Sequence, residues 1–307
     1  MFCNSCGSNK VEIFSQAQDH EYFTTDKIYE YLRCLNCDLI FLKDPPFSEL
    51  SKIYPDYYYS YSYEAEETKI GNKIIYFIKD FFDQRMFNKC LKCCEKKKDI
   101  HILDIGGGDG AISKKLLRNK NISSIDVMDI SDNSSNERRQ TINFIKIRAE
   151  DIDHNKIQKK YDFVLMLNMI EHVMDPKSVM KNIYELMNPG GVCLIKTPNS
   201  KSLNFKIFKN HYWGGLHTPR HFNIFNYLNI KNITQKYQIV DVIFTQGVPQ
   251  WHASLLGFFK IKKIISSNIP IHLRKEGPII TLIFGALDML ILKYFKRSDQ
   301  FFLILKK

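Results

Sequence analysis

Four glycines occur within five positions of the chain, at Gly106, Gly107, Gly108 and Gly110. A mostly apolar stretch at 100–105 precedes them, and a helix-like stretch at 111–118 follows. Glycine has no Cβ and tolerates positive φ, so the backbone there can approach a ligand closely. A helix start also presents N–H groups that lack a partner within the helix. We therefore expect a strand, a tight turn and a helix that together hold a nucleotide-like cofactor.

The spacing of these glycines fits two classes of cofactor. Gly106-x-Gly108-x-x-Ala111 satisfies the dinucleotide fingerprint, and Asp129 follows at the end of the next expected strand, where a carboxylate can hold ribose hydroxyls. A nicotinamide dinucleotide and an adenosyl cofactor both offer such a ribose. The residues alone therefore indicate an adenosine nucleoside and leave the cofactor class open.

Two cysteine pairs near the start of the chain have the spacing of metal ligands. They are Cys3-x-x-Cys6 and Cys34-x-x-Cys37. Two such turns complete a tetrahedral four-sulfur shell suited to Zn²⁺, with no position left open for a water, so we expect a structural ion. Short strands are expected at 11–14, 27–33 and 39–42. The pattern predicts a zinc ribbon over 1–44.

A repeating pattern of strands and helices must position the glycine turn. Strands are expected at 100–105, 123–128, 143–147, 161–167, 191–196, 238–245 and 300–305. Helix-length crossovers between the early strands favour a parallel sheet with right-handed connections. The last strand follows a turn-like segment at 296–299, so we expect it to pair antiparallel at the sheet edge. The fold class predicted is α/β, with a mostly parallel seven-stranded sheet, an antiparallel last strand and the small N-terminal ribbon.

A linker region is expected at 45–98. It opens at Asp44-Pro45-Pro46, which breaks regular structure, and continues through six tyrosines between 54 and 63. Tyrosines at this density suit stacking on carbohydrate or bases, or packing of the linker onto a domain. Apolar residues near helical period predict an amphipathic helix over 70–94. The third domain is expected at 99–307, with an insert at 246–299.

The segment Leu103-Asp104-Ile105-Gly106-Gly107-Gly108-Asp109-Gly110 resembles motif I of the class I S-adenosylmethionine-dependent methyltransferases. Later landmarks follow in the order of that family, at 129–131, 148–151, 162–173 and 188–191. The resemblance implies a Rossmann-like sheet, with the methyl donor as cofactor. The cofactor contacts that it implies are Asp104, Gly106, Gly108, Gly110, Asp129, Glu150 and Asn168.

The ribbon, the tyrosine-rich segment and this core are together similar to bacterial enzymes of sugar, lipopolysaccharide and capsule biosynthesis. These include sugar C-methyltransferases that carry an N-terminal zinc module. The catalytic Glu-His stretch of those enzymes corresponds here to Thr218-Pro219-Arg220-His221-Phe222, with arginine in place of glutamate. The resemblance therefore implies methylation of carbon or, equally, of a hydroxyl oxygen.

Methyl transfer requires a nucleophile aligned with the methyl group and a base that removes its proton. His221 is our first candidate for that base, because imidazole titrates near neutral pH, and His217 and His172 are alternates. Arg220 is a candidate clamp for a carboxylate or a nucleotide phosphate. A structural hydrogen bond is the alternative role for each histidine.

The composition is that of a globular protein, with 44% hydrophobic and 25% charged residues. The net charge of +11 favours an anionic partner, although lysine is abundant along the whole chain and compositional bias explains the charge equally well. The N-terminal residues lack the pattern of a signal peptide, and no apolar run is long enough to span a bilayer. We expect a cytoplasmic protein whose cysteines stay reduced.

The insert is apolar and basic at 278–297, a composition that suits an acidic membrane surface at the inner face. A lid or a dimer surface is the alternative. Membrane contact there would bring the enzyme to a lipid-linked saccharide.

The expected function is methyl transfer from S-adenosylmethionine to a hydroxyl or a carbon of a saccharide or nucleotide-sugar precursor in surface glycan biosynthesis. Alternatives are a methyltransferase for RNA or a quinone-like small molecule, a nicotinamide oxidoreductase, and a non-catalytic binding protein. Asn168 is followed by Met169-Ile170-Glu171 and not by the Pro-Pro-Tyr/Phe of amino-methylating enzymes, which argues against nucleic acid. The acceptor and the oligomeric state stay open.

Overall fold

The computed structural model describes residues 1–55, 58, 73–131, 142–209, 212–245, 248–264, 283–288, 290 and 297–307. These form two sheets, and the larger has the strand order β10-β11-β8-β7-β4-β5-β6. Its strands are β4 (Ile100–Ile105), β5 (Ile122–Asp129), β6 (Ile142–Lys146), β7 (Tyr161–Leu167), β8 (Met187–Pro198), β10 (Gln238–Thr245) and β11 (Gln300–Lys306). The neighbouring pairs among β4 to β8 are parallel, whereas β11 is antiparallel to both of its neighbours. The predicted α/β fold with seven strands is confirmed. The predicted place of the last strand is wrong, because β11 lies between β8 and β10 and the edge strand is β10.

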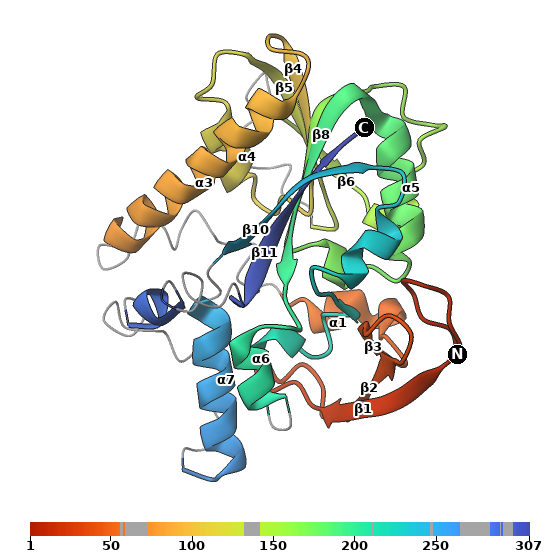
Figure 1. Cartoon of the computed structure of the whole chain (residues 1–307), viewed down its shortest axis with the longest axis vertical. Helices are drawn as coiled ribbons and strands as arrows, with labels where there is room; N and C mark the ends of the chain where they lie inside the picture. Colours follow the sequence, from red (N-terminus) through yellow and green to blue (C-terminus); the bar gives the residue numbers. More distant parts are fainter. Residues whose placement is uncertain are drawn as a thin grey trace.

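Helices cover both faces of this sheet (Figure 1). On one face lie α3 (Lys73–Cys93) and α4 (Ala111–Leu116), and on the other lies α5 (Pro176–Leu186). Side chains alternate accordingly: Leu103 and Val164 pack in the core under α5, while Ile102 and Phe163 pack in the core under α3. Burial on both faces explains why these strands are apolar throughout.

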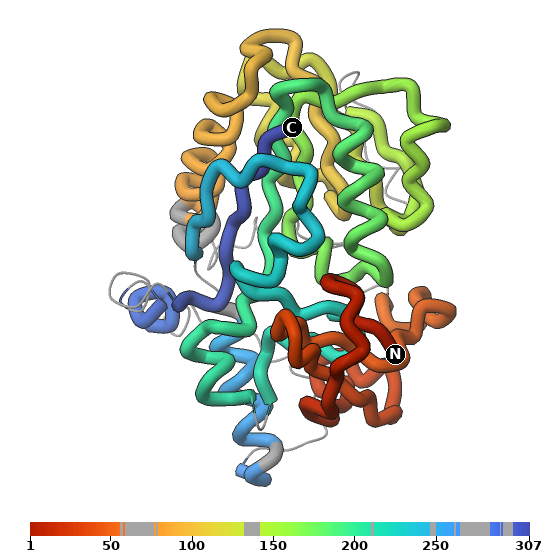
Figure 2. Tube along the Cα trace, turned by 45° about the vertical axis from the view of Figure 1, so that its right-hand side comes forward, coloured from red at the N-terminus to blue at the C-terminus, as the bar shows by residue number. Residues whose placement is uncertain are grey.

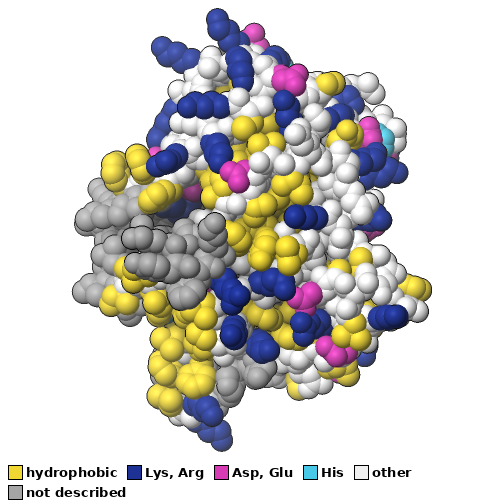
Figure 3. Space-filling view, viewed as in Figure 1, with side chains coloured by type: hydrophobic (Ala, Val, Ile, Leu, Met, Phe, Trp, Pro, Cys, Tyr) yellow, Lys and Arg dark blue, Asp and Glu magenta, His cyan; other side chains and the backbone are white. Residues whose placement is uncertain are grey.

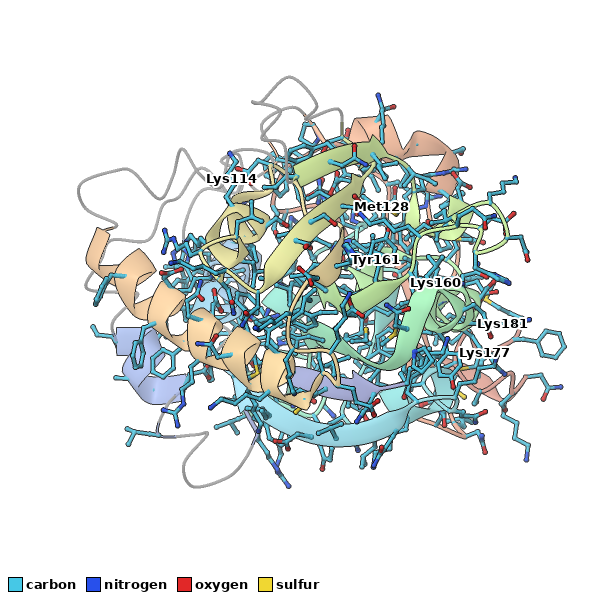
Figure 4. The ribbon with its side chains drawn as sticks, turned by 90° about the horizontal axis from the view of Figure 1, so that it is seen from above. Lys114, Met128, Lys160, Tyr161, Lys177 and Lys181 are labelled. Atoms are coloured by element: carbon cyan, nitrogen blue, oxygen red, sulfur yellow. The ribbon has the colours of Figure 1, made fainter. Side chains whose placement is uncertain are left out.

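Figure 4 shows the molecule from above and labels residues of the sheet and of α5. Tyr161 lies on β7 within the fold, where its hydroxyl donates to Asp126 Oδ2 at 2.6 Å. Lys177 and Lys181 lie on α5 with exposed side chains. This helix begins with Pro176 at its first turn, and Asp175 accepts from the Ser178 N–H at 3.0 Å, a good N-cap.

The smaller sheet has the order β1-β2-β3-β9. Its first three strands are β1 (Val11–Ala17), β2 (Tyr29–Cys34) and β3 (Ile40–Leu42), whereas β9 (Asn223–Ile224) comes from the segment after β8. Ile40 pairs with Ile224 and Phe41 with Asn223. The tube view shows the N-terminal strands beside later segments of the chain (Figure 2). The ribbon is therefore joined to the large domain by backbone hydrogen bonds.

Short helices connect these sheets. They are η1 (Phe47–Glu49), α1 (Leu50–Ile53), η4 (Ala149–Asp151), η5 (Ile170–His172), α6 (Leu203–Phe208), η6 (Gly214–Leu216), η7 (Asn229–Ile233) and α7 (Val248–Ile261). Among the described residues, none of the helices combines the length and the hydropathy needed to cross a bilayer.

Several sequence predictions fall on residues outside the described ranges. Of the six tyrosines, only Tyr54 and Tyr58 are described, and most of 278–297 is not, so membrane contact there stays a prediction.

Helix α3 agrees with the expected helix over 73–93, but Phe77, Phe81 and Phe82 are exposed. Lysine and arginine are spread over the visible face from one end to the other (Figure 3).

Candidate active site

A cavity of about 250 Å³ opens at the carboxyl ends of β4, β5 and β7, where ligands gather in open α/β sheets. One wall is the glycine turn from Gly106 to Gly108, and the opposite wall carries Tyr54, Tyr58 and His172. The cavity thus joins the predicted cofactor residues to part of the predicted catalytic group.

The glycine turn uses left-handed backbone at Gly106 and Gly110, each with φ near +72°. A Cβ at Gly106 would lie 2.6 Å from Met169 Cγ, so no larger residue fits without displacing that side chain. Gly110 precedes α4, and a Cβ there would lie 2.8 Å from the Phe144 ring. Gly106 and Gly108 line the cavity, whereas Gly110 does not. Gly110 therefore shapes the turn, and its predicted contact with the cofactor is not supported.

Acidic side chains line the same end of the cavity. Asp129 accepts from the Gly108 N–H at 2.9 Å and from the Ser131 hydroxyl at 2.6 Å, which ties the end of β5 to the glycine turn. Asp104 is buried and accepts from the Ser113 hydroxyl at 2.7 Å. Burial, with the nearby charge of Asp129 adding to it, raises the pKa of Asp104 to about 6. These acceptors suit a ligand with an amino group and ribose hydroxyls, so the residues fit an adenosyl cofactor.

The other two predicted cofactor residues also line the cavity. Glu150 Oε1 accepts from the Met174 N–H at 3.0 Å. Asn168 has positive φ, and its N–H donates to the Lys196 carbonyl at 2.8 Å. The Glu150 side chain and the Asn168 backbone are thus held at the cavity by contacts with their own domain.

Three predicted histidines form one cluster. The ring centroids of His172 and His221 are 4.6 Å apart, and those of His217 and His221 are 4.9 Å apart. Of the three, only His172 lines the cavity, and His221 lies behind it.

A backbone carbonyl fixes the tautomer of His221. Its Nδ1 lies 2.8 Å from the Gly215 carbonyl, and because a carbonyl only accepts, Nδ1 carries the proton and Nε2 has the lone pair. His172 Nδ1 lies 2.9 Å from the Arg220 carbonyl and 2.8 Å from the Tyr54 hydroxyl, which can donate or accept, so these contacts allow either tautomer. Burial lowers the pKa of His172 to about 3 and that of His221 well below its usual value, so both rings are neutral.

Glu171, next to His172 in the chain, is fully buried. Its Oε2 accepts from the Thr197 hydroxyl at 2.8 Å. Its Oε1 has no hydrogen-bond partner among the described residues and lies 3.9 Å from His221 Nε2. Burial raises the pKa of Glu171 to about 8.

His217 differs from the other two because it has a carboxylate partner. Its Nδ1 lies 2.6 Å from Glu21 Oε2, and its Nε2 lies 3.1 Å from the Tyr58 hydroxyl. Tyr212 donates to the second oxygen of Glu21 at 2.8 Å. Burial opposes ionisation of Glu21, but the charge of His217 and its hydrogen bond outweigh it and lower the pKa of Glu21. Glu21, His217 and Tyr58 therefore form a relay that ends at the cavity wall.

The structure contradicts the predicted role of Arg220. Its guanidinium is fully buried, makes a bidentate ion pair with Asp19 at 2.9 and 3.3 Å, and donates from Nε to the Ile53 carbonyl at 2.7 Å. The remaining N–H groups donate to Thr218 and Thr24. All donors are used internally, so Arg220 joins the ribbon to the histidine segment and cannot clamp a substrate acid.

Asp19 and Glu21 were not among the predicted site residues. Both are isolated acids in the ribbon, and no motif surrounds them. Their partners lie about two hundred positions later in the chain, at 201 positions for Arg220 and 196 for His217. The sequence offers no local signal for such pairs.

The four predicted zinc ligands converge. Cys3 and Cys37 Sγ are 3.6 Å apart, as are Cys6 and Cys34 Sγ, and all four sulfurs lie within 4.8 Å of one another. A tetrahedral zinc site with Zn–S bonds of about 2.3 Å requires sulfurs about 3.8 Å apart. The residues fit a zinc ion, whose presence stays a prediction.

Comparison with known proteins identifies the family of this chain. The model of a family described as "Methyltransferase domain" matches residues 74–242, more than half of the chain. The chain belongs to this family, in agreement with its glycine turn and acidic residues. The nicotinamide alternative is thereby set aside.

Individual curated proteins match only part of this chain. A ubiquinone biosynthesis O-methyltransferase from Coxiella burnetii is 30% identical over 117 residues, which cover 36% of this chain and 47% of the relative. A protein of the same name from Pseudomonas savastanoi is 32% identical over 103 residues, or 32% and 44% of the two chains. This chain thus spans about half the length of these relatives.

One solved structure supports the fold. A protein from Galdieria sulphuraria, named for a proposed sarcosine dimethylglycine methyltransferase activity, superposes with a TM-score of 0.50 at 14% identity. The match covers 75% of this chain and 86% of the other.

Proposed function

We propose that this enzyme transfers a methyl group from S-adenosylmethionine to a hydroxyl oxygen of a saccharide or nucleotide-sugar precursor. The observation that carries the proposal is the position of Tyr58, which lines the cofactor cavity and ends the relay from Glu21 through His217. Tyr54 and Phe47 add aromatic wall beside it. Aromatic faces of this kind suit the apolar face of a sugar ring.

The residues of the relay supply base catalysis. The acceptor hydroxyl gives its proton to the Tyr58 oxygen as the Tyr58 proton passes to His217 Nε2. Glu21, 2.6 Å from Nδ1, stabilises the imidazolium that forms. Bound S-adenosylmethionine supplies the electrophilic methyl group. The relay makes His217, and not His221, our preferred base, because His221 has no ionised partner within hydrogen-bond distance and does not reach the cavity.

A second candidate acceptor is the phenolic hydroxyl of a quinone-like small molecule. The O-methyltransferase names of the relatives favour it, and the same aromatic wall would stack on a phenol ring. A carbon acceptor is disfavoured, since Arg220 stands in place of the glutamate found in the similar sugar C-methyltransferases and all its donors are used within the protein.

The test is a screen with radiolabelled methyl donor over nucleotide sugars, free saccharides and catechols. We expect transfer to a saccharide hydroxyl, at least 100-fold slower in His217→Gln, with unchanged calorimetric affinity for S-adenosylhomocysteine. The matched control is His154→Gln, outside the cavity, which should retain full activity. Transfer to catechols alone would select the second candidate, and full activity of His217→Gln would exclude the relay.

A further inference from the structure

We infer that Glu171, His172 and His221 form a binding site for one divalent transition-metal ion at the part of the cavity wall formed by His172, with Glu171 and His221 behind it. This inference rests on the proposed function, since the ion would bind the acceptor oxygen beside the relay. One ring nitrogen of each histidine and one carboxylate oxygen of Glu171 lie within 4.8 Å of one another.

The orientation of His221 is that of a metal ligand. It donates Nδ1–H to the Gly215 carbonyl and so keeps the Nε2 lone pair for another partner, while His172 Nδ1 contacts the Arg220 carbonyl and the Tyr54 hydroxyl. Outer hydrogen bonds of this kind fix the tautomer and the ring direction of metal-binding histidines.

Glu171 supplies the independent observation. It is fully buried, one oxygen is held by the Thr197 hydroxyl, and the other has no hydrogen-bond partner in the described part of the chain. A buried carboxylate oxygen without a donor is rare, and a cation would satisfy it. That oxygen is the one that faces His221 Nε2.

The separation of these atoms is compatible with a shared ion. Two ligands bound at about 2.1 Å can be at most about 4.2 Å apart, and His221 Nε2 lies 3.9 Å from Glu171 Oε1. The separations that involve His172, the half-buried member at the cavity, are at most 4.8 Å, so a shift of no more than about 0.6 Å would bring this ring within the same limit. Two histidines and one carboxylate suit Zn²⁺, Mn²⁺ or Fe²⁺ and leave coordination positions open.

Such an ion would act as a Lewis acid on the acceptor. Coordination of the hydroxyl oxygen lowers its pKa, and the proton then leaves through Tyr58 to His217. The rings of His172 and His217 lie 6.2 Å apart, so the two functions are neighbours. The oxygen–methyl bond forms as the sulfur–methyl bond breaks, and the ion does not change its oxidation state.

The experiment counts bound zinc in the full-length protein by mass spectrometry after equilibration with Zn²⁺ and gel filtration. We expect two equivalents per chain, one in the cysteine ribbon and one here, and a loss of one equivalent in Glu171→Gln and in His221→Gln. The matched control, Glu185→Gln, changes an exposed carboxylate paired with Lys236 and should keep both. Binding of S-adenosylhomocysteine verifies that each variant is folded.

The count is independent of any acceptor, so it can succeed or fail separately from the proposed function. One equivalent in the wild type, or two in both variants, would overturn the inference. If transfer to an acceptor is found, removal of the second ion should slow it 10- to 100-fold.

Discussion

Glu21 and His217 are 196 positions apart in the chain, and their side chains meet at 2.6 Å between Oε2 and Nδ1. One belongs to the ribbon and the other to the segment after β8. The ion pair of Asp19 with Arg220 and the pairing of β3 with β9 fix the same two segments. The ribbon therefore contributes a carboxylate to the histidine cluster.

Replacing Glu21 should slow methyl transfer without weakening the binding of the cofactor. In Glu21→Gln the imidazolium of His217 loses its counter-charge, and we expect kcat to fall about 10²-fold, the low end for a general base. Steady-state transfer assays and calorimetry with S-adenosylhomocysteine measure the two effects. The control is Glu12→Gln, an exposed carboxylate on β1, which should behave as the wild type. Equal kcat in both variants would show that Glu21 has no part in catalysis.

Breaking the buried ion pair should destabilise the fold. Asp19→Asn leaves the Arg220 guanidinium uncompensated in a fully buried place, and we expect a loss of about 3–5 kcal/mol in the free energy of unfolding. Urea titration followed by circular dichroism measures it. The solvent-accessible pair of Lys43 and Glu30 provides the comparison, because Glu30→Gln should cost far less stability than Asp19→Asn. A similar cost for both variants would contradict the structural role given to Arg220.

The stability that the Asp19–Arg220 ion pair contributes should depend on pH. Burial raises the pKa of Asp19, but the hydrogen bond and charge of Arg220 outweigh it and lower the pKa to about 2. A carboxyl whose pKa is depressed on folding contributes its stability above its unfolded pKa and loses it as pH falls through the folded value. The stability difference between wild type and Asp19→Asn should therefore shrink between about pH 4 and pH 2. A difference that stays constant over this range would contradict the assignment.

Cofactor affinity should rise with pH in the range where Asp104 ionises. Burial raises the pKa of Asp104 to about 6, so the carboxyl that faces the cavity is largely protonated at pH 5 and ionised at pH 7. A cationic amino group of the ligand binds the ionised form better. Calorimetric titration of S-adenosylhomocysteine should show up to about 10-fold tighter binding at pH 7 than at pH 5, and Asp104→Asn should remove most of this dependence. Asp153→Asn, at a partly exposed carboxyl outside the cavity, is the control.

The Asp104 carboxyl also affects the stability of the ligand-free protein, which its ionisation should lower as the pH rises. Its pKa in the folded protein lies above the ordinary aspartate value of 3.8, so the folded state holds the proton more tightly than the unfolded state. Its contribution to the free energy of unfolding therefore falls as pH rises from about 4 to about 6. Asp104→Asn should flatten this part of the stability profile.

Removal of metal from the ribbon should abolish activity. A segment as small as 1–44 buries too little core to fold unaided, and it carries both Asp19 and Glu21. In Cys34→Ser we expect lower thermal stability and at least 100-fold slower transfer. The control is Cys93→Ser on α3, away from the four-sulfur group, which should retain both properties. An unchanged melting profile for Cys34→Ser would argue against a metal-dependent ribbon.

Local patterns in the sequence predicted most of the large sheet. Every strand of that sheet was expected within a few residues of its place, since strands covered on both faces have long apolar runs. The place of β11 was not, because strand order depends on which edges meet in three dimensions. β9 was missed for another reason: two residues are too few to show a period.

Part of the candidate site could also be predicted from the sequence. The glycine turn, Asp104, Asp129 and the three histidines stand in local motifs and could be named from the sequence. Tyr58 could only be included in a group of tyrosines. The roles of Glu21 and Arg220 depend on partners far along the chain, which no local pattern reveals.

The two-residue strand β9 also has a consequence for synthesis on the ribosome. The ribbon is translated before β9, so the outer edge of β3 gains its partner only once Asn223 and Ile224 have emerged. Until then that edge presents unpaired backbone groups to other nascent chains. The small sheet is therefore completed late relative to the synthesis of its own first three strands, and Glu21 meets His217 only at that stage.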